Sequence, residues 1–205
     1  MYFHKTPAFF ATLFPDALWR VKTTKKDIYL TFDDGPIPEA TPWVLAQLQK
    51  FNAKATFFMV GENIKKYPEL YSQVREQGHT IGNHTFNHLQ GRKSDDAAYF
   101  ENVEKTEELL SPYSAKLFRP PHGRLKWSQY NKLKANYKIV MWDVLSGDFS
   151  EGLLPQQCLE KSIRASKPGS IIVFHDSVKA ITKLKEVLPK YLDSFTSAGY
   201  TFKAL

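Results

Sequence analysis

Two histidines and two adjacent carboxylates stand at spacings that suit a metal site. His84 and His88 are four residues apart, so a helical turn between them would place both imidazoles on one side. Asp33 and Asp34 follow an apolar run, and one carboxylate would complete a two-histidine, one-carboxylate face with open positions for water and substrate. That arrangement is typical of a catalytic metal, because structural metals are usually closed by four protein ligands.

Each of these patterns also has a simpler interpretation. Two histidines four residues apart are more often unrelated surface or core residues, and adjacent acidic residues after a strand often only begin a turn. Neighbouring side chains on a strand point in different directions. In the functional interpretation, one of the two carboxylates, Asp33 or Asp34, would bind the metal and the other would face the bound water as general base.

Strands and helices alternate along the chain. We expect seven strands, at 28–33, 55–60, 80–84, 117–119, 138–144, 170–174 and 200–203, and six helices, at 42–51, 64–76, 95–110 with Ser94 as the cap, 127–136, 155–166 and 180–198. The alternation predicts a single-domain α/β fold with outer helices around about seven mostly parallel strands. In this length, that indicates a distorted or incomplete (β/α) barrel.

Further polar residues follow the later strands of this predicted barrel. Arg119 ends the fourth strand, Asp148 follows the fifth and His175 ends the sixth. The C-terminal ends of parallel barrel strands share one face. We therefore expect these three side chains to meet the aspartate pair and the two histidines at one mouth of the barrel.

Five motifs in order resemble those of the NodB-type polysaccharide deacetylases, carbohydrate esterase family 4. They are Thr-Phe-Asp-Asp-Gly-Pro at 31–36, His-Thr-Phe-Asn-His at 84–88, Arg-Pro-Pro-His-Gly at 119–123, Asp-Phe at 148–149 and Val-Phe-His at 173–175. The similarity runs from about residue 27 to residue 176. Five ordered motifs are a specific signature.

The resemblance implies a role for each matched position. Asp34, His84 and His88 would bind one divalent metal ion, usually Zn²⁺, with Co²⁺ or another divalent ion left open. Asp33 would be the general base and His175 the general acid. Arg119 and Asp148 would orient and tune the base, and the backbone N–H of His122 would help to form the oxyanion site.

The chain departs from the family pattern at three positions. His122 stands where the family usually has Tyr, Phe149 replaces the usual Trp, and Val173 replaces the usual Leu. A backbone donor does not depend on its side chain, so the role of His122 survives the change. We expect Phe149 and Val173, together with Pro120 and Pro121, to contact the substrate.

The resemblance implies a hydrolase that removes N-acetyl groups from a GlcNAc-containing glycan, such as peptidoglycan, chito-oligosaccharide or a related surface polysaccharide, and releases acetate. An O-deacetylase of acetylated polysaccharide such as xylan is the enzymatic alternative. An inactive sugar-binding module is the alternative from another class.

Length and composition agree with one soluble domain. The chain has 205 residues and a formal net charge of +7, and we divide it into an N-terminal arm (1–26) and a catalytic domain (27–205). The basic residues are scattered, which disfavours nucleic acid as a partner. A transmembrane segment and an evident signal peptide are lacking, so the sequence predicts a cytoplasmic protein and leaves envelope association and oligomeric state open.

Overall fold

Parallel strands form one open, curved sheet in the computed structural model, which describes residues 3–7 and 9–205. The strand order is β5-β4-β3-β2-β1-β7-β6, and β8 pairs with the first half of β1. The strands are β1 (Asp27–Asp33), β2 (Thr56–Met59), β3 (Thr80–Asn83), β4 (Leu117–Phe118), β5 (Lys138–Ile139), β6 (Val144–Leu145), β7 (Ile171–His175) and β8 (Thr201–Lys203).

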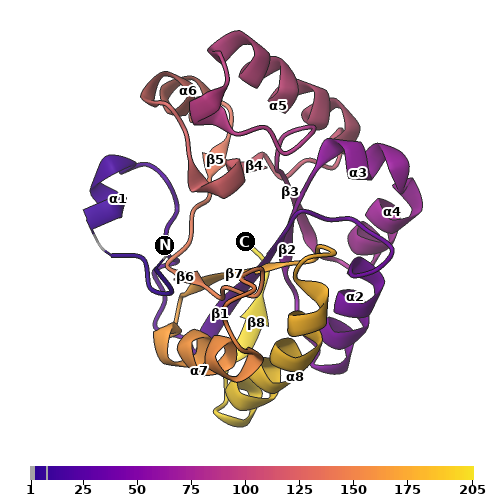
Figure 1. The fold of residues 1–205 in the computed structure, drawn as a ribbon, viewed down its shortest axis with the longest axis vertical. Coiled ribbons are helices and arrows are strands. Elements are labelled where there is room, and N and C mark those ends of the chain that lie inside the picture. Colours follow the sequence, from indigo (N-terminus) through magenta and orange to yellow (C-terminus); the bar gives the residue numbers. More distant parts are fainter. Residues whose placement is uncertain (1–2, 8) are drawn as a thin grey trace.

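Helices surround the strands (Figure 1). They are α1 (Phe9–Leu13), α2 (Thr41–Lys50), α3 (Gly61–Lys66), α4 (Pro68–Glu76), α5 (Asp96–Leu110), α6 (Trp127–Leu133), α7 (Pro155–Ala165) and α8 (Ile181–Ser197), with the 3₁₀ turns η1 (Gly91–Lys93) and η2 (Pro121–Gly123). The prediction of an incomplete (β/α) barrel with outer helices is confirmed.

The described residues contain eight strands rather than about seven, because the strand expected at 138–144 is two strands. Between β5 and β6, the carbonyls of Val140 and Met141 accept hydrogen bonds from the Arg119 guanidinium. Leu18 of the N-terminal arm also bonds here: its N–H donates to the Ile139 carbonyl, and its carbonyl accepts from the Met141 N–H. The contacts from Arg119 and Leu18 thus interrupt the strand, although the N–H groups of Val140 and Asp143 still bond to Phe118 of β4 and Ile171 of β7.

Two helix predictions also need correction. The helix expected at 64–76 is divided into α3 and α4 at Tyr67, because Pro68 has no N–H to continue the first helix. Helix α5 is capped by Asp95 rather than Ser94, since the Asp95 carboxylate accepts a hydrogen bond from the Ala98 N–H at 2.9 Å.

Aromatic side chains join the central strands to the helices outside them. Phe32 of β1 stacks on Phe57 of β2 and Phe174 of β7, with ring centroids 5.1 and 6.0 Å apart, and Tyr191 of α8 packs edge-on against Phe174. All four residues are fully buried. This packing fixes the central strands, whose C-terminal ends carry the site.

The N-terminal arm lies along the opening between β5 and β6 (Figure 1). In addition to the Leu18 contacts, Lys5 forms an antiparallel bridge with Val144, and Arg20 forms one with Ser170. None of the helices within residues 3–7 and 9–205 combines the length and apolar character that crossing a membrane requires.

Candidate metal and catalytic site

The polar residues that follow the strands meet at one end of the sheet. Asp33, the last residue of β1, pairs in register with His175, the last residue of β7. His84 directly follows β3, and Arg119 directly follows β4 with its N–H bonded to the Asn83 carbonyl. The parallel arrangement therefore brings residues that are far apart in the sequence to one mouth, as barrel geometry requires.

Asp34, His84 and His88 form a three-ligand cluster. The Nε2 atoms of His84 and His88 lie 3.7 and 3.3 Å from the Asp34 Oδ1 atom, and one potential ligand atom from each residue lies within 4.8 Å of the others. His84 is buried, whereas the side chains of Asp34 and His88 are about one-third exposed. Three protein ligands at the edge of a cavity would leave coordination positions of a metal free for water and substrate, which is typical of a catalytic metal site.

The two histidines are brought together by a loop, and the helical turn expected between them is absent from the described residues 84–88. Thr85 and His88 have positive φ angles of 66° and 57°. Side chains replace helical hydrogen bonds here: Asn83 Oδ1 accepts from the Thr85 N–H, and Thr85 Oγ1 accepts from the Leu89 N–H, both at 2.9 Å. The helical turn predicted from the spacing of the two histidines is therefore wrong, although both imidazoles do reach one site.

The protonation states of His84 and Asp34 suit metal binding. The Nδ1 atom of His84 lies 2.7 Å from the Arg119 carbonyl oxygen, so it must carry the proton and leave Nε2 as the free donor. Burial lowers the pKa of His84 to about 4, which keeps the ring neutral. Burial opposes ionisation of Asp34, but its bond to His88 and the nearby His175 and His84 hold its pKa below the usual range.

Arg119 is fully buried and holds Asp33. Its Nη1 atom donates to Asp33 Oδ1 and to Thr31 Oγ1, both at 2.7 Å, and its guanidinium lies 4.1 Å from the Phe58 ring centroid. Thr31 and Asp33 are two residues apart on β1, so they share a face and are reached by one guanidinium. One oxygen of Asp33 is thereby fixed, and Oδ2 remains for a partner in the cavity.

Removing this arginine should strongly destabilise the fold. Arg119→Met leaves the Asp33 carboxylate buried without its partner, and breaking a buried pair typically costs about 3–5 kcal/mol. We expect that loss in the free energy of unfolding, measured by urea denaturation. Lys134→Met, which breaks the exposed pair with Asp16, should change it little. Equal effects of the two substitutions would contradict the structural role given to Arg119.

Asp148 contacts His175 and not, as expected, the Arg119–Asp33 pair. Its Oδ1 atom lies 2.8 Å from the His175 Nδ1 atom, and its Oδ2 atom accepts from the His175 N–H at 2.7 Å. Burial opposes protonation of the ring, but the adjacent carboxylate raises the pKa of His175 to about 9. Asp148 therefore orients and charges the imidazole, with Nε2 left to face the cavity.

These residues line one cavity of about 670 Å³, the catalytic cavity. Of the four expected substrate contacts, Phe149 and Val173 line it, and the Phe149 ring lies 5.0 Å from the His175 ring. Pro120 and Pro121 are buried and are not among its lining residues. They instead enter the η2 turn, whose Gly123 N–H bonds to the Pro120 carbonyl.

His122 also lines the catalytic cavity, with its ring centroid 4.8 Å from that of His88. It has a φ of 58°, and the next residue, Gly123, has a φ of 64°. A side chain at Gly123 would collide with the Trp142 ring. This tight turn places His122 at the mouth of the barrel.

Three supporting residues were missed in the sequence. Asp176 is fully buried, and its carboxylate accepts from the Gly35 N–H at 3.1 Å and the Thr41 hydroxyl at 2.6 Å, so it holds the loop that carries Asp34. Asn63 donates to the Asp34 carbonyl at 2.7 Å. Thr31 supports Arg119. Thr31 could have been found from its alternation with Asp33, whereas the other contacts depend on tertiary packing.

An open parallel barrel with an Asp-His-His metal site, a buried aspartate and a paired histidine at its C-terminal mouth defines a class of metal-dependent hydrolases. The sequence profile of the polysaccharide deacetylase family matches residues 20–139. The chain belongs to this family, the NodB-type deacetylases of carbohydrate esterase family 4. Deacetylases of this family are metal-dependent, in agreement with the Asp34, His84 and His88 cluster.

Several relatives are similar over most of the chain. A peptidoglycan-N-acetylglucosamine deacetylase of Bacillus cereus is 38% identical over 161 residues, which are 75% of this chain and 57% of that protein. A second from the same organism is 33% identical over 90% of this chain and 88% of its own length. A chitooligosaccharide deacetylase of Azorhizobium caulinodans is 35% identical over 77% of each chain.

The fold is likewise shared with a solved structure. The crystal structure of the Bc1960 peptidoglycan N-acetylglucosamine deacetylase superimposes with a TM-score of 0.88 and 31% identity, covering 98% of this chain and 95% of that one. The chain thus spans nearly the whole of that structure but just over half of the first Bacillus cereus relative.

Proposed function

We propose that the protein hydrolyses the N-acetyl group of N-acetylglucosamine residues in a glycan, with peptidoglycan as the preferred class. The observation that carries this proposal is the joint placement of the Asp34, His84 and His88 cluster, Asp33 and His175 in one cavity. Relatives whose names specify peptidoglycan or chitooligosaccharide as substrate support it.

Asp33 is suited to be the general base. Arg119 fixes its Oδ1 atom at 2.7 Å, so Oδ2 is free to take a proton from a water molecule that attacks the acetyl carbon. A divalent metal held by Asp34, His84 and His88 would supply Lewis-acid polarisation of the acetyl carbonyl and acidify water. The His122 N–H would donate to the oxygen on which charge develops, the kind of interaction that is usually a large contribution to catalysis.

His175 is suited to be the general acid. Breaking the carbon–nitrogen bond requires a proton on the departing amine, and Asp148 keeps the His175 ring protonated at neutral pH. One water proton goes to Asp33, the water oxygen and the second water proton leave in acetic acid, which then ionises to acetate, and the sugar amine leaves with the proton of His175. Asp33 and His175 then exchange protons with solvent, which restores the starting state.

We infer that Zn²⁺ is the resident ion. Two imidazoles and one carboxylate suit zinc, and three protein ligands are typical of its catalytic sites. The Bc1960 relative was solved with an N-oxidanyl-benzamide, a hydroxamic acid that belongs to a metal-chelating class of compound. Metal analysis of purified protein, with activity restored after chelation by each divalent ion separately, tests the assignment.

The pH profile should report the His175–Asp148 pair. The folded pKa of His175 is raised from 6.5 to about 9, so the acid form is present at lower pH and is lost as pH rises through that value. A divalent cation bound nearby would lower this pKa, so the basic limb of kcat should lie at or below about pH 9. Asp148→Asn should move this limb down by about 1–3 units, whereas an unmoved limb would exclude His175 as the titrating acid.

Acetate release from a substrate panel tests the function itself. We expect release from peptidoglycan fragments and N-acetylchitotetraose, loss of that release with a chelator, and recovery on adding metal. Faster release from acetylated xylan would instead identify an O-deacetylase. Tight binding of the metal-loaded protein to glycans without acetate release would identify a sugar-binding module.

A further inference from the structure

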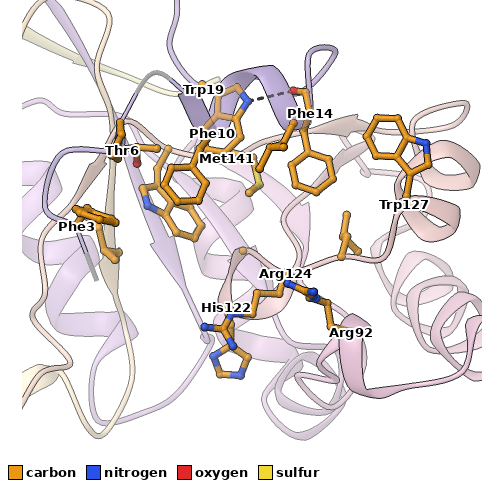
Figure 2. Close-up of a pocket in the computed structure, with 16 residues that line it drawn as sticks. Phe3, Thr6, Phe10, Phe14, Trp19, Arg92, His122, Arg124, Trp127 and Met141 are labelled. Atoms are coloured by element: carbon orange, nitrogen blue, oxygen red, sulfur yellow. Dashed lines mark hydrogen bonds between the residues drawn. The ribbon is translucent and has the colours of Figure 1, made fainter. Parts of the chain in front are cut away.

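A second cavity, here named the arm cavity, opens beside the catalytic cavity. It has a volume of about 630 Å³ and lies between the N-terminal arm and the η2 region. Figure 2 shows arm residues Phe10, Phe14 and Trp19 on one side, with His122, Arg92 and Arg124 across from them. His122, Arg124, Trp142 and Leu145 line both cavities, so the two meet at this edge.

The arm cavity is apolar except at that shared edge. Its walls include Phe10, Phe14, Trp19, Trp127 and Met141, and the residues described around it include no carboxylate. Aromatic faces of this kind pack against C–H groups and methyl groups. Few hydrogen-bonding side chains are present to satisfy a sugar with many free hydroxyl groups, so a small apolar substituent fits these walls better.

The shared edge is strongly cationic. Arg92 and Lys93 lie in η1, Arg124 follows η2, and the two turns pack together: a side chain added at Gly91 would lie 3.1 Å from the Arg124 carbonyl oxygen. Lys93 and Arg124 line the catalytic cavity, and Arg92 lines the arm cavity. All three residues are exposed, and none of the carboxylates in the described part of the chain pairs with their side chains.

Three neighbouring cations without acidic partners repel one another, and an anion between them relieves that repulsion. Arginine guanidinium groups are well suited to a carboxylate, because they donate two parallel hydrogen bonds to it. The anion must also be attached close to the reacting acetyl group, since Lys93 and Arg124 line the same cavity as Asp33, His84 and His175.

We propose, resting on the proposed function, that Arg92, Lys93 and Arg124 bind the carboxylate of an acidic sugar next to the N-acetylglucosamine whose acetyl group is removed. The arm cavity receives the apolar part of the substituent that bears this carboxylate. The glycan class that fits is one in which N-acetylglucosamine alternates with a sugar carrying a lactyl ether, which combines a methyl group with an acid. A peptide attached to that ether supplies the same chemistry through its own carboxylates.

Matched substrates separate charge from shape. We would compare a peptide-free tetrasaccharide of alternating N-acetylglucosamine and lactyl-ether sugars with the same compound after conversion of each lactyl acid to its methylamide. The wild-type protein should have a kcat/KM about tenfold higher for the acid, the effect of about one charge-assisted hydrogen bond. The preference should shrink at high ionic strength. A third substrate, with peptides attached to the lactyl groups, distinguishes the two sources of the carboxylate. A higher kcat/KM for the peptide-free acid points to the lactyl carboxylate, and a higher kcat/KM for the peptide-bearing form points to the peptide carboxylates.

Variants assign the preference to the cationic edge. Arg92→Gln combined with Arg124→Gln should remove the preference for the acid, and Arg92→Lys with Arg124→Lys should retain part of it. The control is Lys185→Gln with Lys190→Gln on the exposed side of α8, which removes the same charge and should retain the full preference. Thermal unfolding checks that each variant is folded.

Each remaining outcome has a clear meaning. Equal kcat/KM for the acid and methylamide in the wild-type protein, or a preference that persists in the double glutamine variant, would overturn the inference while leaving the deacetylase function intact. Absence of acetate release from both forms would overturn the proposed function, and this inference with it.

Discussion

Asp33→Asn should abolish acetate release and leave metal binding intact. The asparagine keeps an oxygen that accepts from Arg119 but has no basic oxygen to take the proton of the attacking water. Loss of a general base typically lowers the rate by about 10²–10⁴-fold. Because Asp33 does not belong to the ligand cluster, the variant should bind one equivalent of metal as the wild-type protein does. Both quantities are measured on the same folded sample, by acetate assay and by metal analysis.

The matched control is Asp16→Asn, a carboxylate of the arm that pairs with Lys134 at the surface. It should retain both activity and metal. Full activity in Asp33→Asn would show that another group accepts the proton. Loss of metal from that variant would show that Asp33, and not Asp34 alone, contributes to the ligand set.

His84→Ala should lose both metal and activity. His84 is a buried ligand whose ring is fixed by the Arg119 carbonyl. Loss of a residue that only hydrogen-bonds to a metal ligand lowers metal affinity by about 10–100-fold. Removal of a ligand itself should lower the affinity more. We expect a metal affinity lowered beyond that range, measured by competition with a chromogenic chelator, and activity that returns in part only at high metal concentration.

His4→Gln provides the comparison, because His4 hydrogen-bonds to Leu145 and lies outside the ligand cluster. It should bind metal with unchanged affinity. If His84→Ala and the wild-type protein held metal equally tightly and were equally active, the ion would have to be bound elsewhere.

Much of the barrel could be predicted because local patterns and global fold agree. The β1 sequence is a nearly continuous apolar run that is buried in the structure, as parallel strands are. Because strands that alternate with helices run parallel, their C-terminal ends meet at one mouth of the barrel. The split at 140–143 could not be predicted, because it depends on hydrogen bonds from Arg119 and Leu18, which are distant in sequence.

In the candidate site, too, the residue types could be predicted from the sequence but their tertiary contacts could not. The aspartate pair and the two histidines were identified from residue type and spacing, together with the resemblance to a known family. The backbone conformation between the two histidines was not predicted, because this loop is held by hydrogen bonds to the side chains of Asn83 and Thr85 in place of helical hydrogen bonds. The partner of Asp148 was also mistaken, since the sequence does not reveal which strand end faces which.

The most direct test of the account is the position of the metal ion. Crystals grown with Zn²⁺ and measured on both sides of the zinc absorption edge should give one strong anomalous peak, about 2.0–2.2 Å from an Asp34 oxygen and the Nε2 atoms of His84 and His88. A strong peak elsewhere with none between these three side chains would contradict the account, as would an ion that His84 does not touch.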